Sequence, residues 1–94
     1  MLTIVATVKA KREDAEFVGA ELEKLVAPTR KEEGCIDYYM HRDNEDDATF
    51  LFYENWESAE HLDRHMAAPH FTACFSAIDG KTEAITVNRL TRLP

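Results

Sequence analysis

The spacing of apolar residues along this chain constrains its fold more than any other feature. Segments in which every second residue is apolar or β-branched predict strands, and apolar residues three or four positions apart predict helices. Ser58 is placed to cap one helical segment, and Gly34 and Gly80 are placed to end others. The predicted strands are Leu2–Ala10, 35–42, 49–56 and the tail 81–93, and the predicted helices are 12–33, 59–69 and 71–78.

This order predicts a ferredoxin-like βαββαβ fold of the α+β class, in which a four-stranded antiparallel sheet carries the helices on one face. A chain of 94 residues forms one small domain, 1–94, whose core is marginal alone. We expect the apolar strand residues to exceed what one sheet face can hold, and two sheets stacked face to face would cover the excess. The chain is therefore predicted to form a homodimer, an α+β barrel. The strand residues concerned are Leu2, Ile4, Phe50, Phe52, Ile85 and Val87.

Several local expectations follow from residue type. Pro28 should kink or end the first helix because proline lacks a backbone donor and clashes with the preceding turn. Pro69 should end a later helix and turn His70 away from it. The run DNEDD at 43–47 predicts the turn of a hairpin. In the strand before it, alternation places Ile36 on the same face as Tyr38 and Met40.

Charge and cysteine content exclude some classes of partner. Eighteen acidic against eleven basic residues give a net charge of −7, which disfavours binding to nucleic acid or anionic membranes. Cys35 and Cys74 follow no metal-ligand spacing, so reduced structural thiols are expected. No apolar run approaches the roughly 18 residues that span a bilayer, and no signal-like segment precedes the first strand, so we expect a cytoplasmic protein.

Three stretches carry a resemblance to a known family: EEGCIDYY (32–39), FLFYENWES (50–58) and HLDRHMAAPHF (61–71). With them the chain resembles the antibiotic biosynthesis monooxygenase family over nearly all 94 residues. The resemblance implies a homodimer with one pocket per subunit between sheet and helices. It also implies oxidation of polycyclic phenols or quinols by molecular oxygen without metal or flavin, although relatives handle other small metabolites or degrade haem. The most specific matching residues are Glu54, Trp56, His65, Pro69, His70 and Phe71.

His65 is the candidate catalytic residue. The family pattern implies that it points inward from its helix, where burial would keep the imidazole neutral and able to accept a proton from a phenol. The resulting phenolate would be electron-rich enough to start oxidation. A half-buried helix histidine bonded to a backbone carbonyl is the alternative structural role, and both interpretations stay open on the sequence.

Five further residues are candidates for substrate binding. Trp56 either stacks on a flat aromatic ring of the substrate or fills the core. Glu54 shares its strand face and needs a partner if it is buried, for which Arg89 on the last strand is the candidate. The complete set is Trp56, Glu54, Tyr38, Phe52 and Arg89.

We expect no metal and no other cofactor. His61, His65 and His70 suggest a metal site, but no carboxylate or cysteine is obviously placed to complete it, and no glycine-rich phosphate loop is present. The resemblance also disfavours haem degradation. The haem-degrading branch has a histidine near the position that Phe75 occupies here, and the other residues typical of that branch are missing as well.

The predicted function is that of a cofactor-independent monooxygenase acting on a small phenol, quinol or similar electron-rich metabolite. Its partners would be a second copy of the chain, the substrate and molecular oxygen. Two alternatives use the same pocket differently. One is a non-catalytic small-molecule binding domain, and the other is a metabolite isomerase in which acid and base groups move protons without oxygen.

Overall fold

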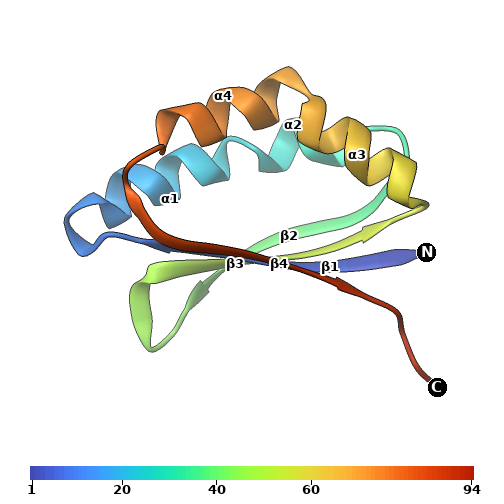
Figure 1. The fold of residues 1–94 in the computed structure, drawn as a ribbon, viewed down its shortest axis with the longest axis horizontal. Coiled ribbons are helices and arrows are strands. Elements are labelled where there is room, and N and C mark those ends of the chain that lie inside the picture. Colours follow the sequence, from blue (N-terminus) through green and yellow to red (C-terminus); the bar gives the residue numbers. More distant parts are fainter.

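The chain forms two layers in a computed structural model that covers residues 1–94, with the helices on one face of a single sheet (Figure 1). The sheet is antiparallel, with strand order β2-β3-β1-β4. The prediction of a ferredoxin-like α+β fold is confirmed. The elements are β1 (Leu2–Ala10), the 3₁₀ helix η1 (Arg12–Asp14), α1 (Ala15–Glu23), α2 (Val26–Arg30), β2 (Cys35–Asp43), β3 (Asp46–Trp56), α3 (Ala59–Ala67), α4 (Pro69–Ala77) and β4 (Thr82–Leu90).

The hairpin between β2 and β3 is tighter than expected, because strand pairing continues to Asp43 opposite Asp46. Side chains of the acidic run close the turn. The Asp43 carboxylate accepts a hydrogen bond from the backbone N–H of Glu45 at 2.8 Å, and the Asp46 carboxylate accepts one from the Thr49 hydroxyl at 2.7 Å. Asp residues that bind nearby backbone and side-chain donors favour turns, which explains why this charged run folds so compactly.

The first predicted helix is divided into two, as expected from Pro28, but the break lies three to four residues before the proline. The first helical segment breaks at Lys24 and Leu25, whose N–H groups bond carbonyls only three residues back, and Pro28 lies in the first turn of α2. The first four N–H groups of a helix have no partner within it, so a proline costs nothing there. Pro69 follows the same rule. It is the first residue of α4, and α3 ends at Ala67 as expected.

Ile36 does not share a face with Tyr38, contrary to the strand alternation. Cys35 pairs with Trp56 and Asp37 pairs with Asn55, so Ile36 is the extra residue of a β-bulge. Its side chain is 49% exposed. A bulge shifts the alternation by one residue, which sequence periodicity alone cannot show.

All six apolar strand residues assigned above to two sheet faces lie on one face, so that expectation is also wrong. The register pairs Val8 with both Phe50 and Ile85, and directly opposite residues point to the same side. This side faces the helices, which pack against β2 and β3. Ile85 and Val87 on β4 therefore face the helix layer and yet remain half exposed.

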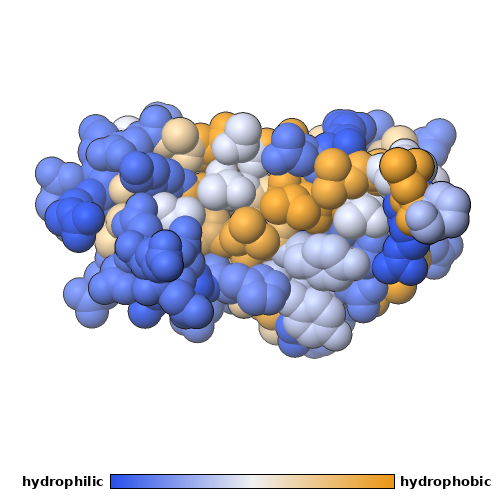
Figure 2. Space-filling model, turned by 90° about the horizontal axis from the view of Figure 1, so that it is seen from below, coloured by the Kyte–Doolittle hydropathy of each residue, from blue (hydrophilic) through white to orange (hydrophobic).

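The opposite sheet face is open and carries an apolar band between polar areas (Figure 2). By register it includes Val5, Leu51 and Tyr53. Asn55 lies on this face and is only 2% exposed, because a local hydrogen-bond network covers it. Its side chain accepts from the Thr3 hydroxyl at 2.6 Å and donates to Asp37 at 3.0 Å.

None of the helices is long and apolar enough to cross a membrane.

Candidate functional site

A cavity of about 190 Å³, which we call the inner cavity, lies between the helix layer and the sheet. Its walls are apolar except for His65 and Glu54. Ile85 and Val87 of β4 border it as well and remain half exposed. The lining residues are Ile4, Ala6, Val8, Leu25, Tyr38, Phe52, Glu54, Leu62, His65, Met66, Phe71, Phe75, Ile85 and Val87.

Helix α3 directs His65 into this cavity. The hydroxyl of Ser58 accepts a hydrogen bond from the backbone N–H of His61 at 3.3 Å and fixes where the helix starts. From that start Leu62 and His65 fall on the buried face, and His65 is 2% exposed. The His61 ring lies 2.7 Å from the Ser58 oxygen, at the helix start rather than in the cavity.

Aromatic rings surround His65 and decide its charge. Trp56 lies 4.8 Å from its ring centroid, Phe71 lies 5.0 Å away edge-on, and Tyr38 lies 5.6 Å away edge-on. Burial among them lowers the pKa of His65, and a hydrogen bond to Glu32 opposes that change without reversing it. The imidazole is therefore neutral near pH 7 and can accept a proton.

Sequence reasoning missed Glu32 as a site residue and misplaced His70. Oε2 of Glu32 lies 2.8 Å from Nδ1 of His65 and 2.7 Å from Nε2 of His70. Pro69 does not turn His70 away, because it starts α4 and leaves His70 in the first turn, facing Glu32. Glu32 comes from a turn that lies 33 and 38 positions before the two histidines, and no spacing in the sequence signals that the three residues meet.

Glu32, His65 and His70 are the residues that could hold a metal ion, since one ligand atom of each lies within 4.8 Å of the others. The expectation that no carboxylate stands near these histidines is wrong. However, separations of 2.7 and 2.8 Å are those of charge-assisted N–H···O hydrogen bonds, so the group is complete without an ion. That the purified protein carries no tightly bound metal stays a prediction, and one equivalent of zinc or iron per chain in an elemental analysis would contradict it.

Glu54 is buried and paired with Trp56 rather than with Arg89. Nε1 of Trp56 donates to its carboxylate at 2.9 Å. Burial raises the pKa of Glu54 to about 7. Arg89 is exposed on β4, and Ile4 stands between it and Glu54 in the sheet.

The structure therefore places four of the six predicted site residues around the inner cavity and two outside its lining. His65, Glu54, Tyr38 and Phe52 line it. Trp56 is fully buried behind His65 and supports the histidine ring, which is the core role considered for it. Arg89 is not part of the lining.

The two cysteines form no disulfide, as expected. Burial is the main cause that raises the pKa of both Cys35 and Cys74 to about 11. Thiols with such a pKa stay protonated at neutral pH and are poor nucleophiles.

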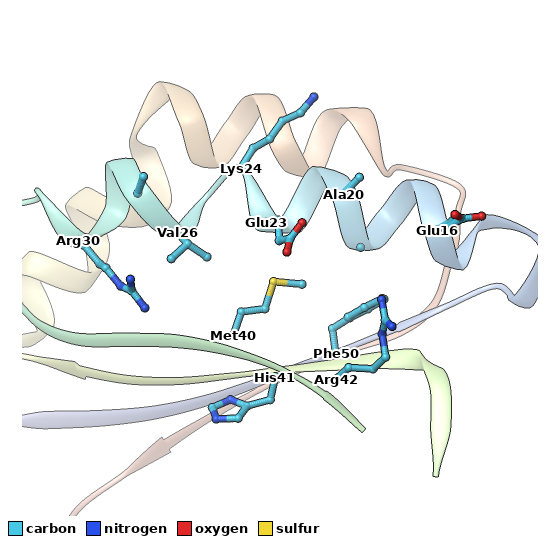
Figure 3. A pocket seen from close by; sticks show the side chains of 12 residues that line it. Glu16, Ala20, Glu23, Lys24, Val26, Arg30, Met40, His41, Arg42 and Phe50 are labelled. Atoms are coloured by element: carbon cyan, nitrogen blue, oxygen red, sulfur yellow. The ribbon is translucent and has the colours of Figure 1, made fainter. Parts of the chain in front are cut away.

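A larger groove of about 930 Å³ lies between α1, α2 and the edge strand β2 (Figure 3). Charged side chains such as Glu23 and Arg30 border it, and Met40 and Phe50 rise toward it from the strands. None of Glu32, Glu54, His65 and His70 lines it. The smaller inner cavity is therefore the candidate active site, because it holds the buried groups that can exchange protons.

Comparison with known proteins gives consistent matches. Residues 1–77 match the family described as antibiotic biosynthesis monooxygenase. The chain is 30% identical over 90 residues to Probable quinol monooxygenase YgiN of Escherichia coli, covering 85% of this chain and 86% of that protein. It is 33% identical over 70 residues to protein sll1783 of Synechocystis, covering 74% of this chain and 48% of that protein, so it spans about half of that relative. The crystal structure of PA3566 from Pseudomonas aeruginosa aligns at a TM-score of 0.94 and 34% identity, covering 99% of this chain and 94% of that one.

Proposed function

Because this chain belongs to the antibiotic biosynthesis monooxygenase family, we propose that it oxidises a small phenol, quinol or similar electron-rich metabolite with molecular oxygen and no cofactor. One observation carries the proposal. His65, buried and neutral, borders an apolar cavity that also contains Glu54. A related protein named as a quinol monooxygenase supports the substrate class.

In the proposed reaction, His65 accepts the proton of a substrate hydroxyl. The phenolate that remains is electron-rich and transfers electrons to oxygen, while the apolar walls keep water from the intermediate. A substrate RH2 and O2 then give RO and H2O, so the substrate supplies all the electrons. Removing a proton first is the step for which the protein needs a base.

The cavity restricts the size of the substrate. Pockets for drug-sized ligands occupy roughly 300 to 1,000 Å³, whereas the inner cavity holds about 190 Å³. A substrate with one or two fused rings fits this space better than a larger polycyclic phenol. Tyr38 and Phe52 would contact its ring, and Glu54 would bind a second hydroxyl group.

Oxygen consumption tests the proposal directly. We expect a menadiol-like quinol or a simple phenol to cause enzyme-dependent oxygen uptake in metal-free and flavin-free buffer, with one atom of ¹⁸O₂ recovered in the product. Binding of these compounds without oxygen uptake would instead favour the non-catalytic binding domain.

An isomerase is the second candidate function, and Glu54 favours it. A carboxyl group with a pKa of about 7 and a neutral imidazole border the same cavity, and such a pair can remove a proton at one position and return it at another. Turnover that continues at the same rate under nitrogen would identify this function.

We also propose that two copies of the chain associate through the open sheet face. The apolar band in Figure 2 supports this arrangement, since water disfavours exposed apolar surface by roughly 25 cal/mol per Å².

A further inference from the structure

We infer that Glu32 fixes His65 in the tautomer that carries its proton on Nδ1, so that the bare Nε2 is presented to the inner cavity, and that His70 holds Glu32 in position. Glu32 and His70 are then positioning residues, because they act through His65 and do not line the cavity. The catalytic consequence of this inference rests on the proposed function. The tautomer itself does not.

Two backbone hydrogen bonds fix the position of Glu32. Its backbone N–H donates to the Thr29 carbonyl at 3.0 Å, and its own carbonyl accepts from the N–H of Cys35 at 3.2 Å. This turn between α2 and β2 brings the side chain, which is 16% exposed, to the two imidazoles. The carboxylate is thus placed by the backbone and shielded from most of the solvent.

The hydrogen bonds decide which nitrogens carry protons. A single oxygen of Glu32 lies within bonding distance of Nδ1 of His65 and Nε2 of His70, and it acts as the acceptor for both. An ionised carboxylate has no hydrogen to donate, so each nitrogen that faces it must carry one. In a neutral imidazole the other ring nitrogen is then bare.

For His65 the bare nitrogen is Nε2. The bond to Glu32 is the only hydrogen bond of the His65 ring, and the ring borders the inner cavity. Nε2 points away from Nδ1 across the ring and so away from Glu32. A substrate that donates a hydroxyl hydrogen finds an acceptor there, whereas one that offers only an ether or carbonyl oxygen does not.

The same carboxylate prepares His65 for the proton it accepts. When Nε2 takes the hydroxyl hydrogen, the imidazole becomes positive while its Nδ1–H still bonds Glu32, and a charge-assisted pair forms without rearrangement. The other titratable groups around His65 are His70 on α4 and Tyr38 on β2, with Glu54 next to Trp56 on β3. None of these three groups forms a hydrogen bond with His65, whose ring bonds Glu32 alone.

Nitrogen-15 NMR of the imidazole rings tests the inference without needing a substrate. Spectra above the pKa of His65, assigned with a His65→Gln variant, should show protonated Nδ1 and bare Nε2. In Glu32→Gln the amide can either accept from or donate to Nδ1, so the proton should move partly to Nε2, and the pKa of His65 should fall further. Glu33→Gln, an exposed neighbour with the same loss of charge, should leave the spectrum unchanged.

His70→Ala should shift the His65 proton distribution in the same direction as Glu32→Gln but less far. An unchanged spectrum in this variant would remove His70 from the inference. A wild-type protein with its His65 proton on Nε2 overturns the inference as a whole, even if oxygen uptake supports the proposed function.

Kinetics separate the two proposals. On a quinol that is turned over, Glu32→Gln should lower kcat by about 10²-fold, the lower end of the contribution of a general base, with little change in KM. A wild-type rate in Glu32→Gln overturns the catalytic part. If the expected tautomer is found but no quinol or phenol consumes oxygen, the inference about Glu32 holds and the proposed monooxygenase function fails.

Discussion

At the scale of single residues, the environment of His65 explains most of the candidate chemistry. The family resemblance implied that this histidine points inward, and the structure places it with Leu62 on the buried face of α3. The sequence did not predict Glu32 as a partner, since a bond between residues 33 positions apart depends on the tertiary fold. Burial and this bond together determine the charge state of the imidazole.

Replacing His65 should separate catalysis from stability. In His65→Gln we expect turnover of an established substrate to fall by about 10² to 10⁴. The free energy of unfolding should fall by only about 1 to 3 kcal/mol, because Glu32 loses one donor but keeps His70. Steady-state kinetics and urea unfolding measure the two effects.

His61→Ala is the matched control, because His61 lies on the same helix but outside the cavity lining. Its turnover should remain at the wild-type value. Unimpaired turnover in His65→Gln would show that the proposed base is wrong, and loss of the fold in that variant alone would show a purely structural role.

Glu54 should make the protein less stable as the pH rises. Burial raises the pKa of Glu54 in the folded state from 4.5 to about 7. A carboxyl group with a raised folded pKa contributes its stability below the unfolded pKa, and that contribution is lost as the pH rises through 7. Glu54→Gln should remove this loss, which is on the order of 3 kcal/mol between pH 4 and pH 8. Urea unfolding at both values measures it, and equal slopes with pH in the two proteins would contradict the burial of a titrating carboxyl group.

At the scale of elements, the positions of strands were predictable and the details of helix breaks were not. The alternation of Leu2–Ala10 matches β1 at both ends. Pro28 and Pro69 were both assigned to helix interruption, and each lies in the first turn of the helix that follows a break, so the break itself comes a few residues before Pro28 and directly before Pro69. Ile36 was misplaced because a bulge leaves no trace in the alternation itself.

Gly34 should be the glycine least tolerant of substitution. It has φ +86°, and an added Cβ would collide with the ring of His61. Gly34→Ala should therefore lower the free energy of unfolding by about 2 to 4 kcal/mol, combining left-handed strain with the clash. Gly80→Ala provides the comparison, since Gly80 has φ +78° with nothing within 4 Å of an added Cβ, and should cost about 1 kcal/mol. Equal losses in urea unfolding would show that the His61 contact has no energetic effect.

At the scale of the whole molecule, the element order was enough to predict the fold class. What the sequence could not show was how much of the sheet the helices cover. The apolar residues of β4 were expected to need a second sheet, but they face the helix layer and border the inner cavity. The surface left for a partner is instead the open face that includes Val5 and Tyr53.

The chain should be a dimer in dilute solution, held by this open face. Light scattering at micromolar concentration should give twice the mass of one chain, and a monomer mass would contradict the proposal. Val5→Glu places a charge on the open sheet face and should give monomers. Ala20→Glu makes the same kind of change on the exposed side of α1 and should leave the dimer intact.

The break between α3 and α4 determines how the two histidines reach one oxygen. In a continuous α-helix, residues five positions apart differ by about 140° around the axis, so their side chains diverge. Ala68, between the helices, has an extended backbone (φ −69°, ψ 147°) that resets this angular phase. One residue with an extended backbone thus lets His65 and His70 converge, and a deletion that joined the helices smoothly would separate the pair without altering either side chain.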